Sequence, residues 1–223
     1  PDVGYMAGNG IMLKTTNGGT NWLVISNSFG GSSVYFTNVY TGYVADGTIY
    51  KTTDGGISWT NLNLSAVVAL TFSGENTGYV VGYNSLIMKT TNSGEDWQFQ
   101  FVSLYENKFN SVKFISPNTG FIAGGKMSEP YSGMIYKTVN GGDSWYPVYP
   151  NSADIGFRSI SFPSKDTGYV VGGYEFGSSG VIYKTINGGE FWNQIGIVNK
   201  DLNSVQFLTN ATGYTVGEGG TIL

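Results

Sequence analysis

A nine-residue motif recurs five times along this chain, and its recurrence limits the chain to a repeat architecture. The motif begins with Lys-Thr, continues through Asn or Asp and then Gly, and ends at Trp. Its copies are residues 14–22, 51–59, 89–97, 137–145 and 184–192. All five tryptophans lie in these copies. Units repeated in this way bury their apolar faces against neighbouring units.

Two further patterns alternate with the motif. Thr-Gly-Tyr-Val or a close variant occupies residues 41–44, 77–80, 119–122, 167–170 and 212–215, and Gly4-Tyr5 begins a shortened copy. A run ending in Phe occupies residues 32–36, 68–72, 110–114, 158–162 and 203–207. Each unit thus has four short runs, which we call a, b, c and d in chain order. Run a ends in Phe, run b starts with Gly-Tyr, run c leads into Lys-Thr, and run d starts at Trp. Such runs, bounded by turn residues, predict β-strands.

Four strands in each unit predict the blade of a β-propeller. The expected fold class is all-β, a propeller of four-stranded antiparallel blades with about five to six repeats present. We expect one domain over residues 1–223. The sequence starts in run b of one unit and stops in run c of another. We therefore expect part of a larger ring with both ends cut, because a propeller joins its last blade to its first.

The repeated polar residues of the motif are interpreted structurally. Asn-Gly and Asp-Gly favour turns with positive φ, so we expect Asn17, Asp54, Asn92, Asn140 and Asn187 to shape turns. The tryptophans are expected to pack between strands or blades rather than to stack on sugars. For the five repeated lysines, we expect solvated or edge-protecting positions.

Composition excludes several classes of function. The net charge is −4, and Arg158 is the single arginine, so the clustered cations that nucleic-acid binding needs are missing. The chain has no His and no Cys, and so neither an imidazole base nor a thiolate. No run of apolar residues approaches the length of a membrane span. We expect no metal and no cofactor, since hard metals need several carboxylates at one site.

Two units break the symmetry of the repeat. The third and fourth intervals between tryptophans are longer than the first two, and the extra residues lie between runs b and c, at residues 125–133 and 173–180. These neighbouring loops carry the expected ligand-binding residues, which are Lys126, Glu129, Tyr131, Tyr174, Glu175 and Phe176, with Met127 beside them. Aromatic rings beside charges are typical of protein or glycan contacts. Neutral insertion at tolerant loop tips is the alternative.

The Thr-x-(Asn/Asp)-Gly-Gly-x-x-Trp turn resembles the Asp-box, or bacterial neuraminidase repeat (BNR). With Thr-Gly-Tyr-Val-Val-Gly before it, the unit is similar to the repeats of photosystem II assembly factors, which also occur in secreted bacterial proteins. Sialidases of this fold use an arginine triad, and the assembly factors an arginine-rich patch; one arginine supplies neither. Xyloglucan-type hydrolases use paired loop carboxylates, for which the candidates are Glu129, Asp154, Asp166, Glu175 and Asp201.

The function expected from these observations is a non-catalytic binding or scaffold module of an exported bacterial protein. We expect it to be secreted or at the cell surface, with the periplasm as the alternative, and to contact a protein or glycan through loops on one face. We expect neither a nucleic-acid partner nor a membrane span, and membership of a larger protein or complex. A glycoside hydrolase with loop carboxylates and an assembly chaperone for a membrane complex are the alternatives.

Overall fold

A computed structural model of the chain describes residues 2–8, 10–100, 106–129, 131–174 and 179–223. Within them the strands form six antiparallel sheets, one for each unit, and each sheet follows chain order. The first sheet joins β1 (Gly4–Gly8), β2 (Ile11–Thr15) and β3 (Leu23–Ser26), and the second joins β4 (Ser33–Phe36), β5 (Gly42–Ala45), β6 (Ile49–Thr52) and β7 (Thr60–Asn61). The third joins β8 (Val67–Phe72), β9 (Gly78–Gly82), β10 (Ile87–Thr90) and β11 (Gln98–Phe99).

The fourth sheet joins β12 (Asn107–Phe114), β13 (Gly120–Lys126), β14 (Ser132–Thr138) and β15 (Tyr146–Ala153). The fifth joins β16 (Ile155–Ser161), β17 (Gly168–Tyr174), β18 (Gly180–Thr185) and β19 (Asn193–Val198). The sixth has β20 (Leu202–Phe207) and β21 (Gly213–Gly217), followed by the short helix η1 (Glu218–Gly220) and one bridge between Val216 and Ile222. The predicted all-β propeller blades are confirmed.

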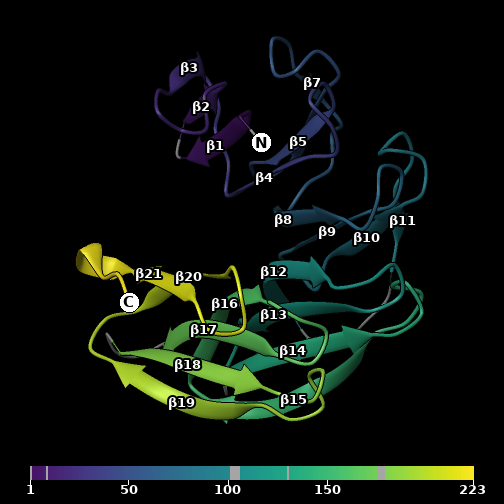
Figure 1. The fold of residues 1–223 in the computed structure, drawn as a ribbon. Coiled ribbons are helices and arrows are strands. Elements are labelled where there is room, and N and C mark those ends of the chain that lie inside the picture. Colours follow the sequence, from purple (N-terminus) through teal and green to yellow (C-terminus); the bar gives the residue numbers. More distant parts are fainter. Residues whose placement is uncertain (1, 9, 101–105, 130, 175–178) are drawn as a thin grey trace.

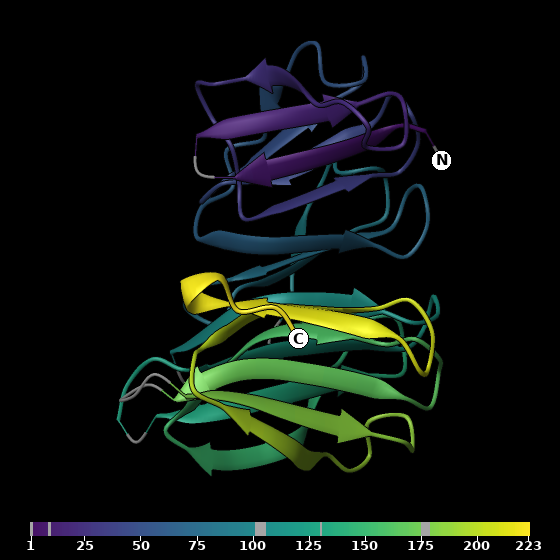
Figure 2. The same ribbon diagram turned by 60° about the vertical axis from the view of Figure 1, so that its left-hand side comes forward.

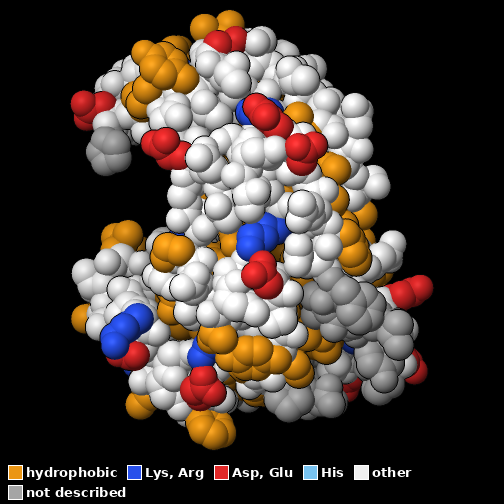
Figure 3. Space-filling view, turned by 90° about the vertical axis from the view of Figure 1, so that its right-hand side faces the viewer, with side chains coloured by type: hydrophobic (Ala, Val, Ile, Leu, Met, Phe, Trp, Pro, Cys, Tyr) orange, Lys and Arg blue, Asp and Glu red, His pale blue; other side chains and the backbone are white. Residues whose placement is uncertain are grey.

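The sheets are arranged as an arc around an axis (Figure 1). The a strands β4, β8, β12, β16 and β20 contact one another in series and are innermost, while β15 and β19 lie at the outside. The first and last sheets stand at the two ends of the arc, and a space-filling view shows the surface hollowed between the upper and lower halves (Figure 3). The burial of each b strand depends on where its sheet lies in the arc. All of β5 and β9 is buried, whereas β1 and β21 are mostly part-exposed.

Connections between strands gather on two faces of the arc (Figure 2). On the turn face, each c–d turn is hydrogen-bonded to the a–b turn of its own sheet. The Gly55 amide donates to the Tyr40 carbonyl at 2.8 Å, and the Gly188 amide to the Asp166 carbonyl at 2.9 Å. On the loop face, the b–c and d–a connections meet: the Met127 amide donates to the Glu106 carbonyl at 3.0 Å.

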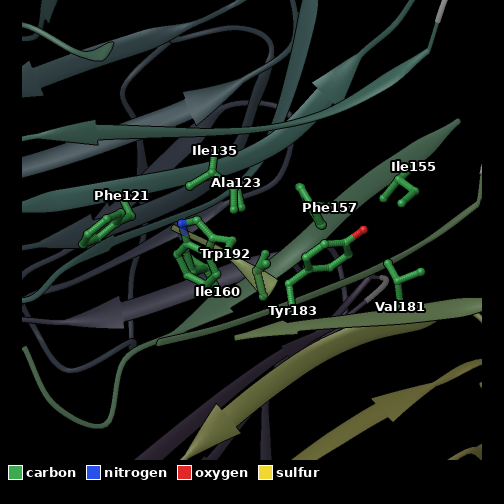
Figure 4. Packing of buried hydrophobic residues seen from close by; sticks show 10 residues of the cluster. Phe121, Ala123, Ile135, Ile155, Phe157, Ile160, Val181, Tyr183 and Trp192 are labelled. Atoms are coloured by element: carbon green, nitrogen blue, oxygen red, sulfur yellow. The ribbon is translucent and has the colours of Figure 1, made fainter. Parts of the chain in front are cut away.

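The apolar core lies between sheets rather than within them. Figure 4 shows Phe121, Ala123 and Ile135 of the fourth sheet directed towards Ile160, Tyr183 and Trp192 of the fifth unit. Trp145 and Trp192 are buried and the other three tryptophans are half-buried, as packing predicts.

A Gly–Phe pair explains why five of the six b strands start with glycine. The Phe that ends strand a lies over the first Gly of strand b, so a Cβ on Gly42, Gly78, Gly120, Gly168 or Gly213 would lie 2.4–2.7 Å from the ring. The same Phe stacks on the next aromatic residue along strand b of the preceding sheet, as Phe114 does on Tyr79 with centroids 3.9 Å apart. One phenylalanine therefore fixes the a–b pairing and the interface between sheets.

The Asn and Asp side chains shape turns, as predicted. In the second motif, the Thr52 hydroxyl donates to Asp54 Oδ1 at 2.7 Å and accepts from the Gly56 amide at 3.0 Å. Hydrogen bonds from the Ser58 hydroxyl and amide and from Thr52 hold the Asp54 pKa well below its usual range. The same threonine and glycine contacts recur in all five motifs.

The expectation is wrong for four of the five repeated lysines. Lys14 Nζ donates to the Gly55 carbonyl at 2.8 Å and Lys51 Nζ to the Ser93 carbonyl at 2.7 Å, in each case in the next unit. Lys89 pairs with Asp143 and the buried Lys137 with Glu190. Beside these lysines, Tyr43 and Tyr79 donate to turn carbonyls of the next unit, and burial raises the pKa of each to about 12. These four lysines therefore link neighbouring units.

Candidate functional site

A hollow of about 170 Å³ opens on the loop face between the fourth and fifth sheets. It lies where the first long b–c loop meets the starts of two innermost strands. Its lining residues are Lys108, Asn110, Gly125, Lys126, Met127, Tyr131, Ile155, Gly156 and Arg158. The hollow is thus located where the sequence departs from its own repeat.

The long loop is held against the neighbouring unit by backbone contacts. Asp154 lies in the d–a connection between β15 and β16, and its amide donates to the carbonyl of Tyr131 in the long b–c loop at 2.9 Å. Asp154 itself has a φ of +62°, which turns the chain sharply from β15 into β16. Inside the loop, Lys126 Nζ donates to the Glu129 carbonyl at 3.4 Å. These contacts place Lys126 and Tyr131 beside one another at the hollow.

β-Bulges direct the inner-strand side chains. The a–b register shifts between Val67 and Ala69, Phe109 and Ser111, Phe157 and Ser159, and Leu202 and Ser204. The residues between them include Asn110 and Arg158, and a bulge re-aims the side chain of its extra residue. Asn110 Nδ2 donates to the Phe157 carbonyl at 2.8 Å, and Arg158 Nη1 donates to Asn203 Oδ1 at 2.9 Å. Asn110 and Arg158 therefore each reach the next innermost strand.

Arg158 also forms an ion pair with Asp201, whose side chain is 8% exposed. Asp201 Oδ2 accepts from the guanidinium, while Asp201 Oδ1 is buried without a hydrogen-bond partner among the described residues. A buried carboxylate needs a cation beside it, here the Arg158 guanidinium, since an uncompensated charge is costly in an interior. The pair links the fifth and sixth units and holds the guanidinium at the edge of the hollow.

The hollow concentrates positive charge. Lys108, Lys126 and Arg158 line it in a chain with a net charge of −4, and Asp201 neutralises one of the three. Lys108 Nζ lies 5.0 Å from the centroid of the Tyr83 ring, a cation–π contact on the loop face. Cationic and amide donors converging on one hollow suit an anionic group, because charge-assisted hydrogen bonds are the strong ones.

The predicted site residues have different locations. Lys126 and Tyr131 line the hollow together with Met127. Glu129 is exposed in the loop, and its carbonyl rather than its carboxylate contacts Lys126. Tyr174 is half-buried and packs against the core between the fourth and fifth sheets. Glu175 and Phe176 lie outside the described residues.

Four lining side chains were missed by the sequence interpretation of the site: Lys108, Asn110, Ile155 and Arg158. A signal for two of them exists, because Asn110 and Arg158 occupy the same position in run a of successive units. Equivalent positions of neighbouring innermost strands lie side by side around a propeller axis. Comparing the five runs position by position would therefore have predicted that Arg158 lies near the first long loop.

Two of the five carboxylates proposed for hydrolysis are engaged or remote from the hollow. Asp201 is held by Arg158, and Asp166 lies on the turn face, opposite the hollow. Within the described ranges no group of three acidic side chains is placed to hold a metal ion. The same ranges contain no helix of the length and apolar character required to cross a membrane.

Fold and turn chemistry together define a repeat β-propeller with Asp-box-like turns. Residues 60–152 match the family model described as photosynthesis system II assembly factor YCF48. No curated protein matches the sequence significantly. The chain is a β-propeller with BNR-type turns, and its residues 60–152 are similar to the YCF48-like group.

Solved structures show the same fold. A GH74 enzyme from Niastella koreensis superposes with a TM-score of 0.78 at 17% identity, over 99% of this chain and 43% of that chain. YCF48 from Cyanidioschyzon merolae superposes at 0.61 and 17% identity, over 100% and 90%. YCF48 bound to D1 peptide superposes at 0.50 and 16%, over 99% and 88%. This chain therefore spans less than half of the GH74 enzyme and most of the YCF48 proteins.

Proposed function

We propose that the chain is a non-catalytic binding module that contacts an acidic segment of a partner protein through the hollow on its loop face. One observation carries the proposal: three of the chain's few cations, Lys108, Lys126 and Arg158, converge on one hollow. Five other lysines belong to the turn motifs of the opposite face. Tyr131 adds an aromatic contact of the kind that protein interfaces favour.

Binding is favoured over hydrolysis by the state of two of the five candidate acids, Asp201 and Asp166. Hydrolysis of a glycoside needs two carboxylates at a defined separation, one of them free to exchange a proton. Asp201 is occupied as the counter-ion of Arg158, and Asp166 is on the turn face. The likeness to GH74 enzymes supports the fold alone, at 17% identity.

The proposal includes the setting of the module: an exported bacterial protein, secreted or at the cell surface, with the periplasm as the alternative. The similarity of the repeat to those of secreted bacterial proteins supports this setting. A second candidate, assembly factor for a membrane complex, is favoured by the match of residues 60–152 to the YCF48 family model. Both candidates use the propeller as a protein-binding scaffold.

The test is binding of a fluorescein-labelled hexaglutamate peptide, followed by fluorescence anisotropy. Lys126→Glu should weaken binding by about tenfold or more, since a charge-assisted contact is lost and a repulsion is introduced. Lys165→Glu is the matched control, because the Lys165 side chain is 84% exposed and lies beside Asp166 on the turn face. Acidic and neutral oligosaccharides form the glycan arm. Equal affinities of the two lysine variants would contradict the proposal.

A further inference from the structure

One position on the loop face, two residues before the bulge residue of the innermost strand, differs between the last three sheets. In the fourth sheet it is Lys108, which pairs with Gly125 of strand b. In the fifth sheet it is Gly156, which pairs with Gly173. In the sixth sheet it is Asp201. The fifth sheet therefore has no side chain at a position where both of its neighbours carry a charged one.

Asp201 shows which group fits over the paired glycine of the preceding sheet. Its carboxylate lies over Gly173, where an ideal Cβ would be 2.1 Å from Asp201 Oδ1 and 2.5 Å from Asp201 Cγ. Arg158, the bulge residue of that same preceding sheet, donates to Asp201 Oδ2. Only glycine leaves room for so close an approach. We call the space over this glycine the seat, and between the fifth and sixth sheets a carboxylate from the next unit fills it.

The equivalent seat between the fourth and fifth sheets belongs to the hollow. Gly125 corresponds to Gly173, since each pairs with the residue two before the bulge residue. The three atoms nearest to an ideal Cβ on Gly125 are backbone atoms, namely Ser132 O at 3.2 Å, Gly156 Cα at 3.5 Å and Ile155 O at 3.6 Å. Gly125 and Gly156 both line the hollow. The hollow thus includes a place that a carboxylate fills one unit further on.

The charges around this second seat also suit a carboxylate. Lys126 directly follows Gly125, and Lys108 pairs with Gly125 across the strands. Both lysines line the hollow together with Arg158, and no acidic residue is among its described lining residues. Asn110 has the bulge position that Arg158 has beside the first seat, and it contributes a neutral amide. The cations are therefore supplied by this chain, and the matching anion has to come from a ligand.

We propose that the hollow takes one carboxylate side chain, an aspartate or glutamate of the partner, seated over Gly125 as Asp201 is seated over Gly173. This inference rests on the proposed function and narrows the ligand from an acidic segment to a single inserted acidic residue. Charge-assisted hydrogen bonds from the two lysines hold the carboxylate. Diffuse attraction would depend on charge alone, whereas insertion depends also on the space that Gly156 leaves.

Substitutions of Gly156 separate insertion from diffuse attraction. The neighbouring sheets carry Lys108 and Asp201 at this position, so its backbone accepts a side chain. Gly156→Asn fills the seat without changing the charge, and it should weaken binding of the hexaglutamate peptide at least about tenfold in the anisotropy assay. Gly74→Asn is the matched control and should bind as the wild type does, because Gly74 lies between β8 and β9 on the turn face with no atom within 4 Å of an ideal Cβ.

A second measurement needs no ligand. Gly156→Asp supplies the carboxylate from the chain itself, so it should melt about 2–4 °C above Gly156→Asn at low ionic strength. High salt should reduce this difference by screening the charges. Equal melting temperatures of the two variants would show that the seat does not favour a carboxylate and would overturn the proposal.

The outcomes distinguish this proposal from the function on which it rests. If the wild type binds hexaglutamate and Gly156→Asn binds it equally well, insertion is refuted while the binding of acidic segments stands. If the wild type does not bind hexaglutamate, the proposed function itself is refuted. A neutral Gly-Ser peptide with a free carboxyl terminus should not compete with hexaglutamate. Competition by it would assign the seat to a chain terminus and overturn the assignment to a side chain.

Discussion

Two adjacent threonines in the third motif should differ strongly in how much stability the same substitution removes. The Thr90 side chain is 1% exposed; its hydroxyl donates to Asn92 Oδ1 at 2.9 Å and accepts from the buried Gly94 amide at 2.9 Å. Thr91 is exposed. Valine at position 90 keeps the shape of the side chain but removes both of these hydrogen bonds and a longer one from the Asn92 amide at 3.3 Å.

The size of the effect follows from these contacts. An unpaired buried amide costs about 1–3 kcal/mol, and a lost hydroxyl hydrogen bond about 1 kcal/mol. Thr90→Val should therefore lower the free energy of unfolding by about 2–4 kcal/mol. Thr91→Val should change it by less than about 0.5 kcal/mol, because Val139 already occupies that position in the fourth motif.

Urea titration followed by circular dichroism measures both variants under the same conditions. Thr90→Ser serves as a further control, since it retains the hydroxyl and should recover most of the loss. If Thr90→Val and Thr91→Val unfold at the same urea concentration, the argument that this turn is held by the threonine hydroxyl is refuted.

Three further predictions concern packing, pH and catalysis. Gly78→Val should destabilise the fold by about 1–3 kcal/mol or more, because its Cβ would lie 2.6 Å from the Phe72 ring, and thermal melting should show it against a Gly74→Val control. The folded pKa of Asp54 is depressed, so its stabilising contribution is complete above the unfolded pKa of about 3.9 and is lost as pH falls through the folded pKa. Unfolding at pH 7 and pH 3 should accordingly differ less in Asp54→Asn. No sialidase activity is expected in a fluorogenic assay, because the single arginine is engaged by Asp201; turnover at enzyme-like rates would disprove the arginine argument.

The fold was predictable because its determinants repeat within each unit. The Asn-Gly turn, the Gly at the start of strand b and the Trp of strand d each occur at a regular place, and local chemistry explains each of them. The lysines were interpreted wrongly for the opposite reason. Lys14 and Lys51 reach carbonyls of the next unit. The pattern of a single unit gives no sign of a partner that the neighbouring unit supplies.

The candidate site was predictable in part. Lys126 and Tyr131 follow from the unusual length of one loop, which marks a departure from the repeat. Lys108 and Arg158 come from regular strands, and their approach to the loop depends on a β-bulge and on the packing of neighbouring sheets. Tyr174 was assigned to the binding surface, yet its ring contributes to the core between sheets. Side-chain direction near a bulge depends on pairing register, which composition and spacing do not specify.

Amide hydrogen exchange with and without the hexaglutamate peptide tests the central claim most directly, because it locates the bound ligand. Binding in the hollow should slow exchange at Met127 and Asp154, whose amides hold the loop face together. Exchange at Gly55 and Gly188, whose amides hold the turn face, should stay unchanged. Protection at Gly55 and Gly188 without protection at Met127 and Asp154 would contradict the assignment of the binding surface to the loop face.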